Sequence, residues 1–270
     1  MPGSVPQTMS ARLISSAGRD GILINSDDNM IGGVDRADHN IVNLNGSAGI
    51  EITYGRTGNQ VYNAWIGTGS NGKQHQGNVG AGVSIHGTGN TVLESVIAYN
   101  HGNGIEVLDG TSNALRLSRI YANGKMAIDL GGDGVTPNDS VGLDFDTGPN
   151  DLQNAPVIRR ADHLTSIVRG KLVSTPNSTF TIEIWSSPVC DNAKHGEARV
   201  GLAGAAADPW LTLLGSMIDT TPIPESGFRD RSGTIGRSTF FAGLGTGAKV
   251  TLQGRIVGTQ VVWTAARRAG

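Results

Sequence analysis

The most regular feature of the chain is a short alternation of aliphatic and variable residues that recurs along its first half. A glycine precedes an aliphatic residue, a variable residue and a second aliphatic residue, and the first aliphatic residues of successive copies are 28, 33, 22 and 23 positions apart. Alternation of period two predicts strands too short to be stable alone, so equivalent strands are expected to stack. The copies are Gly21-Ile22-Leu23-Ile24, Gly49-Ile50-Glu51-Ile52, Gly82-Val83-Ser84-Ile85, Gly104-Ile105-Glu106-Val107 and, with alanine first, Ala127-Ile128-Asp129-Leu130.

A second short segment, or phrase, of asparagine, a variable residue and an aliphatic residue follows each of the first four copies. Three coils add a third phrase with an aliphatic residue, at Ile66, Ile97 and Ile120. Asparagine and glycine suit the corners between phrases because both tolerate left-handed backbone angles. We expect Ile22, Ile50, Val83, Ile105 and Ile128 to form one buried column, with Asn90 and Asn113 stacked at a neighbouring corner, at a spacing of about 4.8 Å. The second phrases are Asn29-Met30-Ile31, Asn59-Gln60-Val61, Asn90-Thr91-Val92 and Asn113-Ala114-Leu115.

This pattern predicts an all-β fold in which residues 1–155 form a right-handed parallel β-helix. A leucine-rich repeat has coils of similar length, but its Leu-x-x-Leu-x-Leu frame is missing here. Polar insertions at residues 32–39 and 68–80 are expected to project as loops. One of them contains Gly67-Thr68-Gly69-Ser70-Asn71-Gly72, which matches a dinucleotide-binding motif; no helix is predicted after it, so we interpret it as a loop.

Residues 156–270 predict a second domain, a small immunoglobulin-like β-sandwich. Longer alternating runs at residues 179–185, 250–253 and 259–263 indicate half-buried strands, and turns rich in Pro, Gly and Ser separate them.

Composition narrows the classes of function. The 270 residues include 40 glycines and only 16% charged residues, which is typical of a turn-rich β protein. A net charge of −2 without a Lys/Arg cluster argues against a nucleic-acid partner. The single cysteine, Cys190, excludes an internal disulfide. No apolar run is long enough to span a membrane, and the first residues lack the features of a signal peptide.

Several motifs carry a family resemblance. They are Asn29-Met30-Ile31-Gly32-Gly33, Ala127-Ile128-Asp129-Leu130-Gly131-Gly132-Asp133-Gly134, Asp146-Thr147-Gly148-Pro149-Asn150-Asp151 and Thr175-Pro176-Asn177-Ser178-Thr179-Phe180. Together they resemble bacterial secreted β-helix repeat proteins of the pectate-lyase-like superfamily, which often carry a CSLREA-type N-terminal region. The resemblance covers roughly residues 12–200 and implies a secreted or surface-attached product, a sandwich module after the helix, and no single activity.

The two ends of the chain depart from this family. The stretch at residues 10–18 resembles the end of a coil, so earlier coils are expected to be missing. Residues 1–11 have little apolar surface, and the open first coil is expected to fray or to self-associate. The C-terminal residues 263–270 do not match the family's closing strand, which leaves the completeness of the second module open.

Stacking places the variable residues of the first phrase in one outward column. Glu106 and Asp129 fall on adjacent coils, and Glu51 belongs to the same column. Such acids suit glycoside chemistry, or a Ca²⁺ site of a uronate-cleaving lyase. Solvated surface acids are the alternative interpretation.

Two other groups of residues are candidate binding positions. The acidic stretch after the last coil could bind Ca²⁺ through Asp133, Asp139, Asp144 and Asp146. The EF-hand frame is missing from this stretch. A polar linker in which these side chains cap turns is the alternative. Three aromatic residues lie at outward or corner positions of the coils: Trp65, Tyr99 and Tyr121. They could stack on sugars, or pack against loops instead.

Three functional hypotheses follow. The first is a non-catalytic extracellular module that binds carbohydrate or cell-surface material and needs no cofactor. The second is a polysaccharide lyase, hydrolase or epimerase that acts through Glu51, Glu106 and Asp129. The third is a divergent fragment without retained activity.

Overall fold

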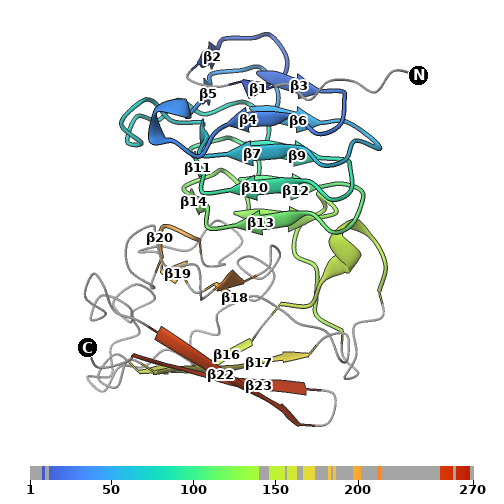
Figure 1. Ribbon diagram of the computed structural model, residues 1–270, viewed down its shortest axis with the longest axis vertical. Helices are drawn as coiled ribbons and strands as arrows, with labels where there is room; N and C mark the ends of the chain where they lie inside the picture. Colours follow the sequence, from blue (N-terminus) through green and yellow to red (C-terminus); the bar gives the residue numbers. More distant parts are fainter. Residues whose placement is uncertain are drawn as a thin grey trace.

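The structure is a computed structural model, and it describes residues 8–9, 12–139, 146–155, 157–162, 167–173, 182–183, 185–186, 197–201, 212–213, 250–257 and 260–267. The regular elements of these residues are strands, apart from two short 3-10 helices, η1 (Arg36–Asp38) and η2 (Pro149–Leu152). Figure 1 shows short strands stacked in columns along the long axis of the molecule. No described helix is long and apolar enough to cross a membrane.

Three parallel sheets of five strands each build the stack, as a parallel β-helix requires. The first sheet contains β1 (Thr8–Met9), β4 (Met30–Gly32), β7 (Gln60–Tyr62), β10 (Thr91–Leu93) and β13 (Ala114–Arg116). The second sheet contains β2 (Leu13–Ser15), β5 (Ile41–Asn43), β8 (Trp65–Ile66), β11 (Val96–Ala98) and β14 (Arg119–Tyr121). The third sheet contains β3 (Ile22–Ile24), β6 (Ile50–Ile52), β9 (Val83–Ile85), β12 (Ile105–Val107) and β15 (Ile128–Leu130).

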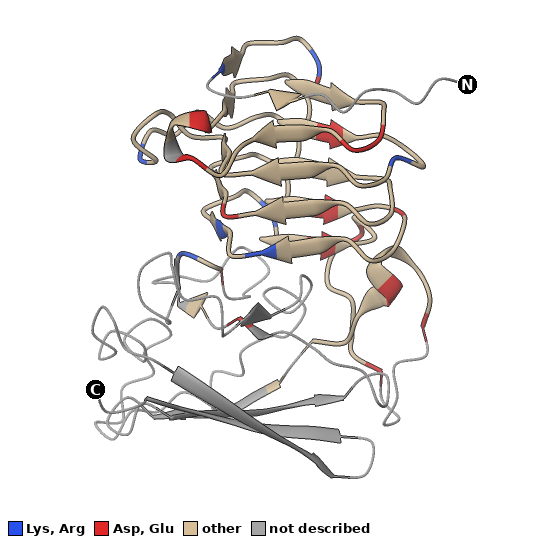
Figure 2. Cartoon of the chain, viewed as in Figure 1, with Lys and Arg blue, Asp and Glu red and all other residues tan. Residues whose placement is uncertain are grey.

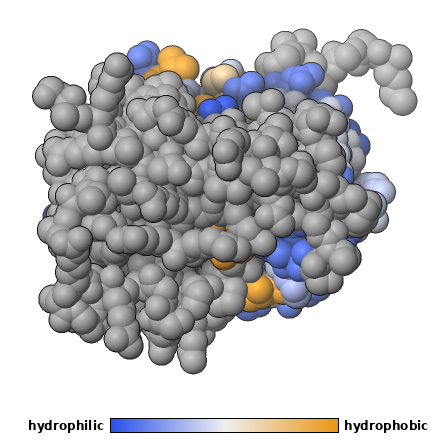
Figure 3. All heavy atoms as spheres, turned by 90° about the horizontal axis from the view of Figure 1, so that it is seen from below, coloured by the Kyte–Doolittle hydropathy of each residue, from blue (hydrophilic) through white to orange (hydrophobic). Residues whose placement is uncertain are grey.

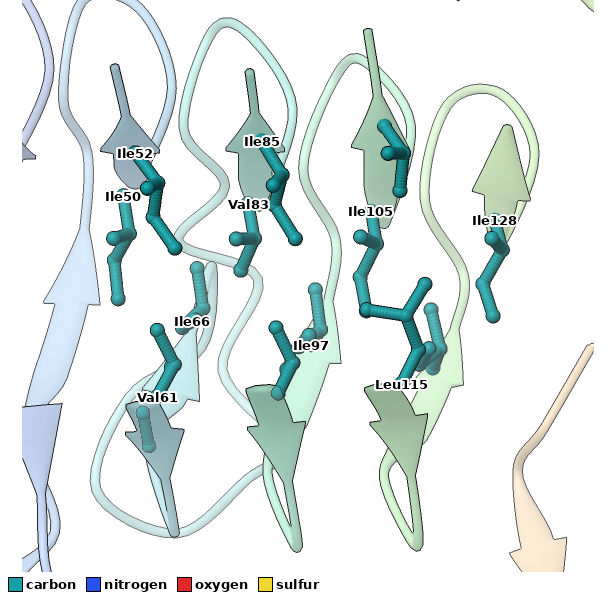
Figure 4. Close-up of a cluster of buried hydrophobic side chains, with 14 of the residues drawn as sticks. Ile50, Ile52, Val61, Ile66, Val83, Ile85, Ile97, Ile105, Leu115 and Ile128 are labelled. Carbon is teal, nitrogen blue, oxygen red and sulfur yellow. The ribbon is translucent and has the colours of Figure 1, made fainter. Parts of the chain in front are cut away.

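The register of the third sheet confirms the predicted column of aliphatic residues. Ile22 pairs with Ile50, Ile50 with Val83, Val83 with Ile105, and Ile105 with Ile128. All five side chains are buried. They meet aliphatic residues of the other two sheets in a narrow core, as Figure 4 shows for Val61, Ile66, Ile97 and Leu115.

The glycine before each first-phrase strand is required by close packing between coils. A Cβ atom at Gly104 would lie 2.3 Å from Cγ2 of Ile120 and 2.6 Å from the carbonyl oxygen of Ala127 in the next coil. Both distances are too short for a real side chain. Ala127 directly precedes β15, the last strand of the third sheet, and within the described residues no later strand of that sheet places a carbonyl against it. This explains why the fifth copy of the repeat tolerates alanine.

Two ladders of buried asparagines line corners of the coils. In each ladder the Nδ2 atom of one residue donates to the Oδ1 atom of its equivalent in the next coil, which confirms the predicted stacking of Asn90 on Asn113. Asn150 extends the first ladder, because its Oδ1 atom accepts from the backbone N–H of Asn113. The first ladder runs through Asn29, Asn59, Asn90 and Asn113, and the second through Asn45, Asn78, Asn100 and Asn123.

The predicted reason for asparagine at the corners is wrong in one respect. The eight ladder residues from Asn29 to Asn113 and from Asn45 to Asn123 do not have left-handed backbones. The residue before the asparagine does in seven of the eight cases, and Gly77 before Asn78 is the exception. The asparagines are required for their side chains, which satisfy backbone and side-chain donors of the neighbouring coil. The left-handed residues are diverse, as Asp28, Gly58, Gly89 and Ser112 show before the first ladder, and Leu44, Tyr99 and Ala122 before the second.

Longer strands follow the coils. They are β16 (Val157–Asp162), β17 (Ile167–Val173), β22 (Val250–Val257) and β23 (Gln260–Arg267), and they form one antiparallel sheet in the order β16-β17-β23-β22. Two small antiparallel pairs join β18 (Ile182–Glu183) to β21 (Thr212–Leu213), and β19 (Trp185–Ser186) to β20 (Val200–Gly201). Seen from this end, the described atoms that are visible are mostly hydrophilic, with a few hydrophobic ones (Figure 3). A sandwich arrangement and a right-handed helix stay predictions.

Segments after the coils cover the last turn of the β-helix. Ala198 forms an antiparallel bridge to Ile120, with N–H···O distances of 2.9 and 2.8 Å in the two directions. The backbone N–H of Leu117 donates to Oε1 of Glu183 at 2.6 Å, and Nε1 of Trp185 donates to Oε2 at 2.8 Å. Glu183 is only 6% exposed. These contacts close the C-terminal end of the core.

At the other end, β1, β2 and β3 are the edge strands of the three sheets. Met9 and Ile14 are partly buried against the core, and Ile22 and Ile24 are buried. Residues 1–7, 10 and 11 lie outside the described residues. The expected fraying or self-association of this end therefore stays a prediction.

Candidate functional site

The outward face of the third sheet carries the acidic column that the sequence predicts. Leu23 pairs with Glu51, Glu51 with Ser84, Ser84 with Glu106, and Glu106 with Asp129. In Figure 2 the strands β6 and β12 each carry an acidic segment at the same position along the strand, with β9 between them. Exposure is 59% at Leu23, 4% at Ser84 and 2% at Asp129, whereas Glu51 and Glu106 are half-buried, so the members of the column have different environments.

Asp129 is enclosed by hydrogen-bond donors. Its Oδ1 atom accepts from the backbone N–H of Gly132 at 3.1 Å, and its Oδ2 atom accepts from the N–H of Gly134 at 3.2 Å and from Nδ2 of Asn103 at 3.0 Å. Burial raises the pKa of Asp129, while these donors partly oppose the shift. The interpretation of the column as solvated surface acids is wrong for Asp129, because the turn at residues 131–134 covers it. Its carboxylate holds that turn in place.

Glu106 is a half-buried acid between two buried members of the column, Ser84 and Asp129. The Nδ2 atom of Asn103 donates to Oε2 of Glu106 at 3.2 Å as well as to Asp129. This shared amide lies between two carboxylates on adjacent coils and offsets their mutual repulsion. The side chain of Glu106 is half-buried, so it is positioned by Asn103 and still reaches solvent.

Glu51 is the second accessible acid of the column. Burial raises its pKa, and the nearby charges of Asp20 and Glu106 raise it further, whereas His86 lowers it. Asp20 is itself fixed, because its Oδ1 atom accepts from the backbone N–H of Ala48 at 2.8 Å. Glu51 is therefore a carboxyl group that binds a proton more readily than an ordinary glutamate.

Ser84 separates the two glutamates. It is 4% exposed, and it pairs with Glu51 on one side and with Glu106 on the other. Glu51 and Glu106 therefore stand two coils apart, which is about 10 Å along the helix axis. Because Ser84 is small, the carboxylate oxygens of Glu51 and Glu106 remain as hydrogen-bond acceptors on either side of its coil. This arrangement can accept hydrogen bonds from a ligand with several hydroxyl or amino groups.

Sequence reasoning missed the positions that support this column. Asp20 and Asn103 each lie two residues before the first aliphatic residue of their coils, at one equivalent position of the repeat. Their counterparts in the other coils are Ala48, Ala81 and Met126. Counting this second column would have identified Asp20 and Asn103 as neighbours of the acids. His86 also lies near enough to Glu51 to lower the pKa of its carboxyl group.

The aromatic candidates lie on or beside the second sheet and have partners within the protein. Trp65 lies 4.9 Å from the ring of His39. Tyr99 stacks on His75 at 3.9 Å, and Tyr121, which is 3% exposed, donates from its hydroxyl to the carbonyl of Gly72 at 3.0 Å. Loop packing therefore accounts for Tyr121, and sugar stacking stays a prediction for Trp65 and Tyr99.

The acidic candidates for Ca²⁺ are not brought together in the described part of the chain. Among the described residues, no group of three or more His, Cys, Asp or Glu side chains is placed to hold a metal ion. The backbone N–H of Asp139 donates to Oδ1 of Asn154 at 2.8 Å, so this part of the linker is tied to its own chain. Asp144 lies outside the described residues, and Ca²⁺ binding there stays a prediction.

Comparisons with known proteins leave the family resemblance as an expectation. No protein-family model, no curated protein and no solved structure matches the chain.

Proposed function

We propose that the chain is a non-catalytic glycan-binding module whose ligand lies on the outward face of the third sheet. The observation that carries this proposal is the pair Glu51 and Glu106, held two coils apart on either side of the buried Ser84. Carboxylates accept strong hydrogen bonds from hydroxyl and ammonium groups. A rigid stack of coils fixes their spacing before the ligand arrives, which lowers the entropic cost of binding.

The charge of this face selects the class of glycan. Asp20, Glu51 and Glu106 contribute carboxyl groups, and the one ion pair within the described residues is elsewhere, between Arg56 and Asp27. Burial raises the pKa of Glu51, and the negative charges of Asp20 and Glu106 raise it further, while His86 lowers it. A polyuronate would add further repulsion. We therefore propose a neutral or amino-bearing glycan, and an extracellular location consistent with the family resemblance.

A binding screen tests this proposal. The chain is titrated with neutral, amino-bearing and uronate oligosaccharides, and binding is measured by calorimetry. Glu51→Gln and Glu106→Gln should each weaken binding by about tenfold to a hundredfold, because a hydrogen bond to a charged group contributes about 1.5–3 kcal/mol. Glu94→Gln is the matched control, since Glu94 is an exposed acid at a corner before the second sheet. Binding of uronates alone, or equal binding by all variants, would contradict the proposal.

Hydrolysis is a second candidate, which the raised pKa of Glu51 specifically favours. A general acid must carry a proton before the reaction, and inverting glycosidases hold two carboxyl groups about 6.5–9.5 Å apart, close to the spacing of about 10 Å between the strands of Glu51 and Glu106. Each glycan that binds should therefore be incubated with the protein and examined for new reducing ends. Products that Glu51→Gln abolishes would establish an enzyme. Bound glycans recovered intact would leave the binding module as the function.

A further inference from the structure

Two arginines meet at the C-terminal edge of the second sheet, on a different face from the acidic column. The antiparallel bridge between Ile120 and Ala198 places Arg119 opposite Arg199. Both guanidinium groups rest on the ring of Tyr121, with their Cζ atoms 5.6 and 5.1 Å from its centroid. Nε of Arg119 donates to the carbonyl of Arg199 at 3.0 Å, so the two are held in one arrangement.

Like charges directly opposite each other destabilise a strand pair unless something compensates them. The ring of Tyr121 compensates part of the charge through cation–π contacts. The one ion pair between described residues joins Arg56 and Asp27, so no described carboxylate forms an ion pair with Arg119 or Arg199. Glu197 faces Tyr121 across the same bridge but is 4% exposed, whereas Arg119 is at the surface. The exposed side of the pair therefore carries excess positive charge.

The insertion loop adds two exposed groups to this surface. The hydroxyl of Tyr121 donates to the carbonyl of Gly72, the residue before the exposed Lys73. His75 stacks on Tyr99, whose ring makes an edge contact with Tyr121 at 5.8 Å between centroids. His75 is exposed, and the contacts through Tyr99 connect its ring to Tyr121, on which the two guanidinium groups rest.

We infer that Arg119 and Arg199 form a binding site for an oxyanion group, a sulfate or carboxylate, carried by an acidic glycan. Guanidinium forks match the planar geometry of such oxygens and bind them bidentately. The Nη atoms of Arg119 are the ones that would bind the anion, since its Nε atom already donates to the carbonyl of Arg199. The exposed ring of His75 provides a surface for the sugar that carries the anion. The site lies on the second sheet and does not rest on the function proposed for the third.

The inference is tested with three probes: inorganic sulfate, a sulfated oligosaccharide and a uronate oligosaccharide of equal length. Binding to the whole chain is measured by calorimetry at two salt concentrations. At least one of the two oligosaccharides should bind saturably, and its affinity should fall as salt rises. Arg119→Gln and Arg199→Gln should each weaken that binding at least tenfold, and the preferred oligosaccharide identifies the anionic group.

Arg12→Gln is the matched control, because Arg12 is an exposed arginine beside the opposite end of the same sheet. It should leave binding unchanged. Arg119→Lys keeps the charge without the fork and should also weaken binding, which separates bidentate recognition from general charge attraction. Circular dichroism checks that each variant is folded. Equal affinity of Arg119→Gln, Arg199→Gln and wild type would overturn the site, and binding of inorganic sulfate without either oligosaccharide would overturn the glycan assignment.

Discussion

At the scale of single residues, seven of the eight corners that carry a ladder asparagine divide two tasks between neighbouring positions. One residue takes the left-handed turn, and the next provides a side chain that bonds to the neighbouring coil. Asn100 shows the second task, because it donates to Asn123 and accepts from Asn78. The residue before it, Tyr99, takes the turn at a φ of 65°. The recurrence of asparagine is visible in the sequence, whereas left-handed Tyr99, Glu94 or Leu117 is not.

This division predicts opposite effects of two substitutions on stability. Ala122 is exposed and has a φ of 54°, a conformation that costs L-residues about 1–2 kcal/mol. Ala122→Gly should therefore raise the free energy of unfolding by up to about 1 kcal/mol. Gly89 has a φ of 67° and open space around it, so Gly89→Ala should lower stability by about 1 kcal/mol through the backbone alone. Urea denaturation measures both. Destabilisation by Ala122→Gly would show that the corner does not strain alanine.

At the scale of elements, the local repeat determines most of the β-helix. Period-two alternation fixes which side chains point inward, and equal spacing brings equivalent residues into register. These rules are local, so the aliphatic columns and the acidic column could be predicted from sequence. The burial of Asp129 could not, because it depends on how residues 131–134 fold back over the sheet. The covering of Leu117 by Glu183 joins residues 66 positions apart, and no pattern in the sequence indicates it.

The columns predict how stability responds to loss of core volume. Ile105 is fully buried between Val83 and Ile128. Ile105→Ala should lower the free energy of unfolding by about 2–5 kcal/mol, because the rigid coils cannot close the cavity. Leu23→Ala is the matched control on an outward position of the same sheet, and it should change stability by about 0.5 kcal/mol or less. Similar losses for the two variants, measured by denaturant unfolding, would contradict the assignment of inward and outward faces.

At the scale of the whole molecule, the segments after the coils act as a cover for the last turn. Glu183 is the centre of this contact, and burial raises its pKa to about 7. The folded chain therefore holds a proton on Glu183 up to about pH 7, while the unfolded chain loses it near the ordinary value of 4.5. Because the folded state binds more protons in this window, stability falls as pH rises through it.

The size of this effect is about 3 kcal/mol between pH 4.5 and pH 7, from about 1.4 kcal/mol for each unit of pKa shift. Glu183→Gln cannot ionise, so the difference in unfolding free energy between wild type and this variant should change by that amount across the window. Denaturant unfolding at a series of pH values gives this difference directly. Two parallel curves from pH 4.5 to pH 7 would show that Glu183 is not buried against the coil.

The central claim is that the acidic face of the third sheet binds the glycan of the proposed function. The most direct test is mapping of backbone amide chemical shifts during titration with a glycan that binds. A neutral or amino-bearing glycan should perturb the amides around Glu51, Ser84, His86 and Glu106, and leave those around Arg119 and Tyr121 unchanged. Perturbations confined to other surfaces, with the third sheet unaffected at saturation, would contradict the account.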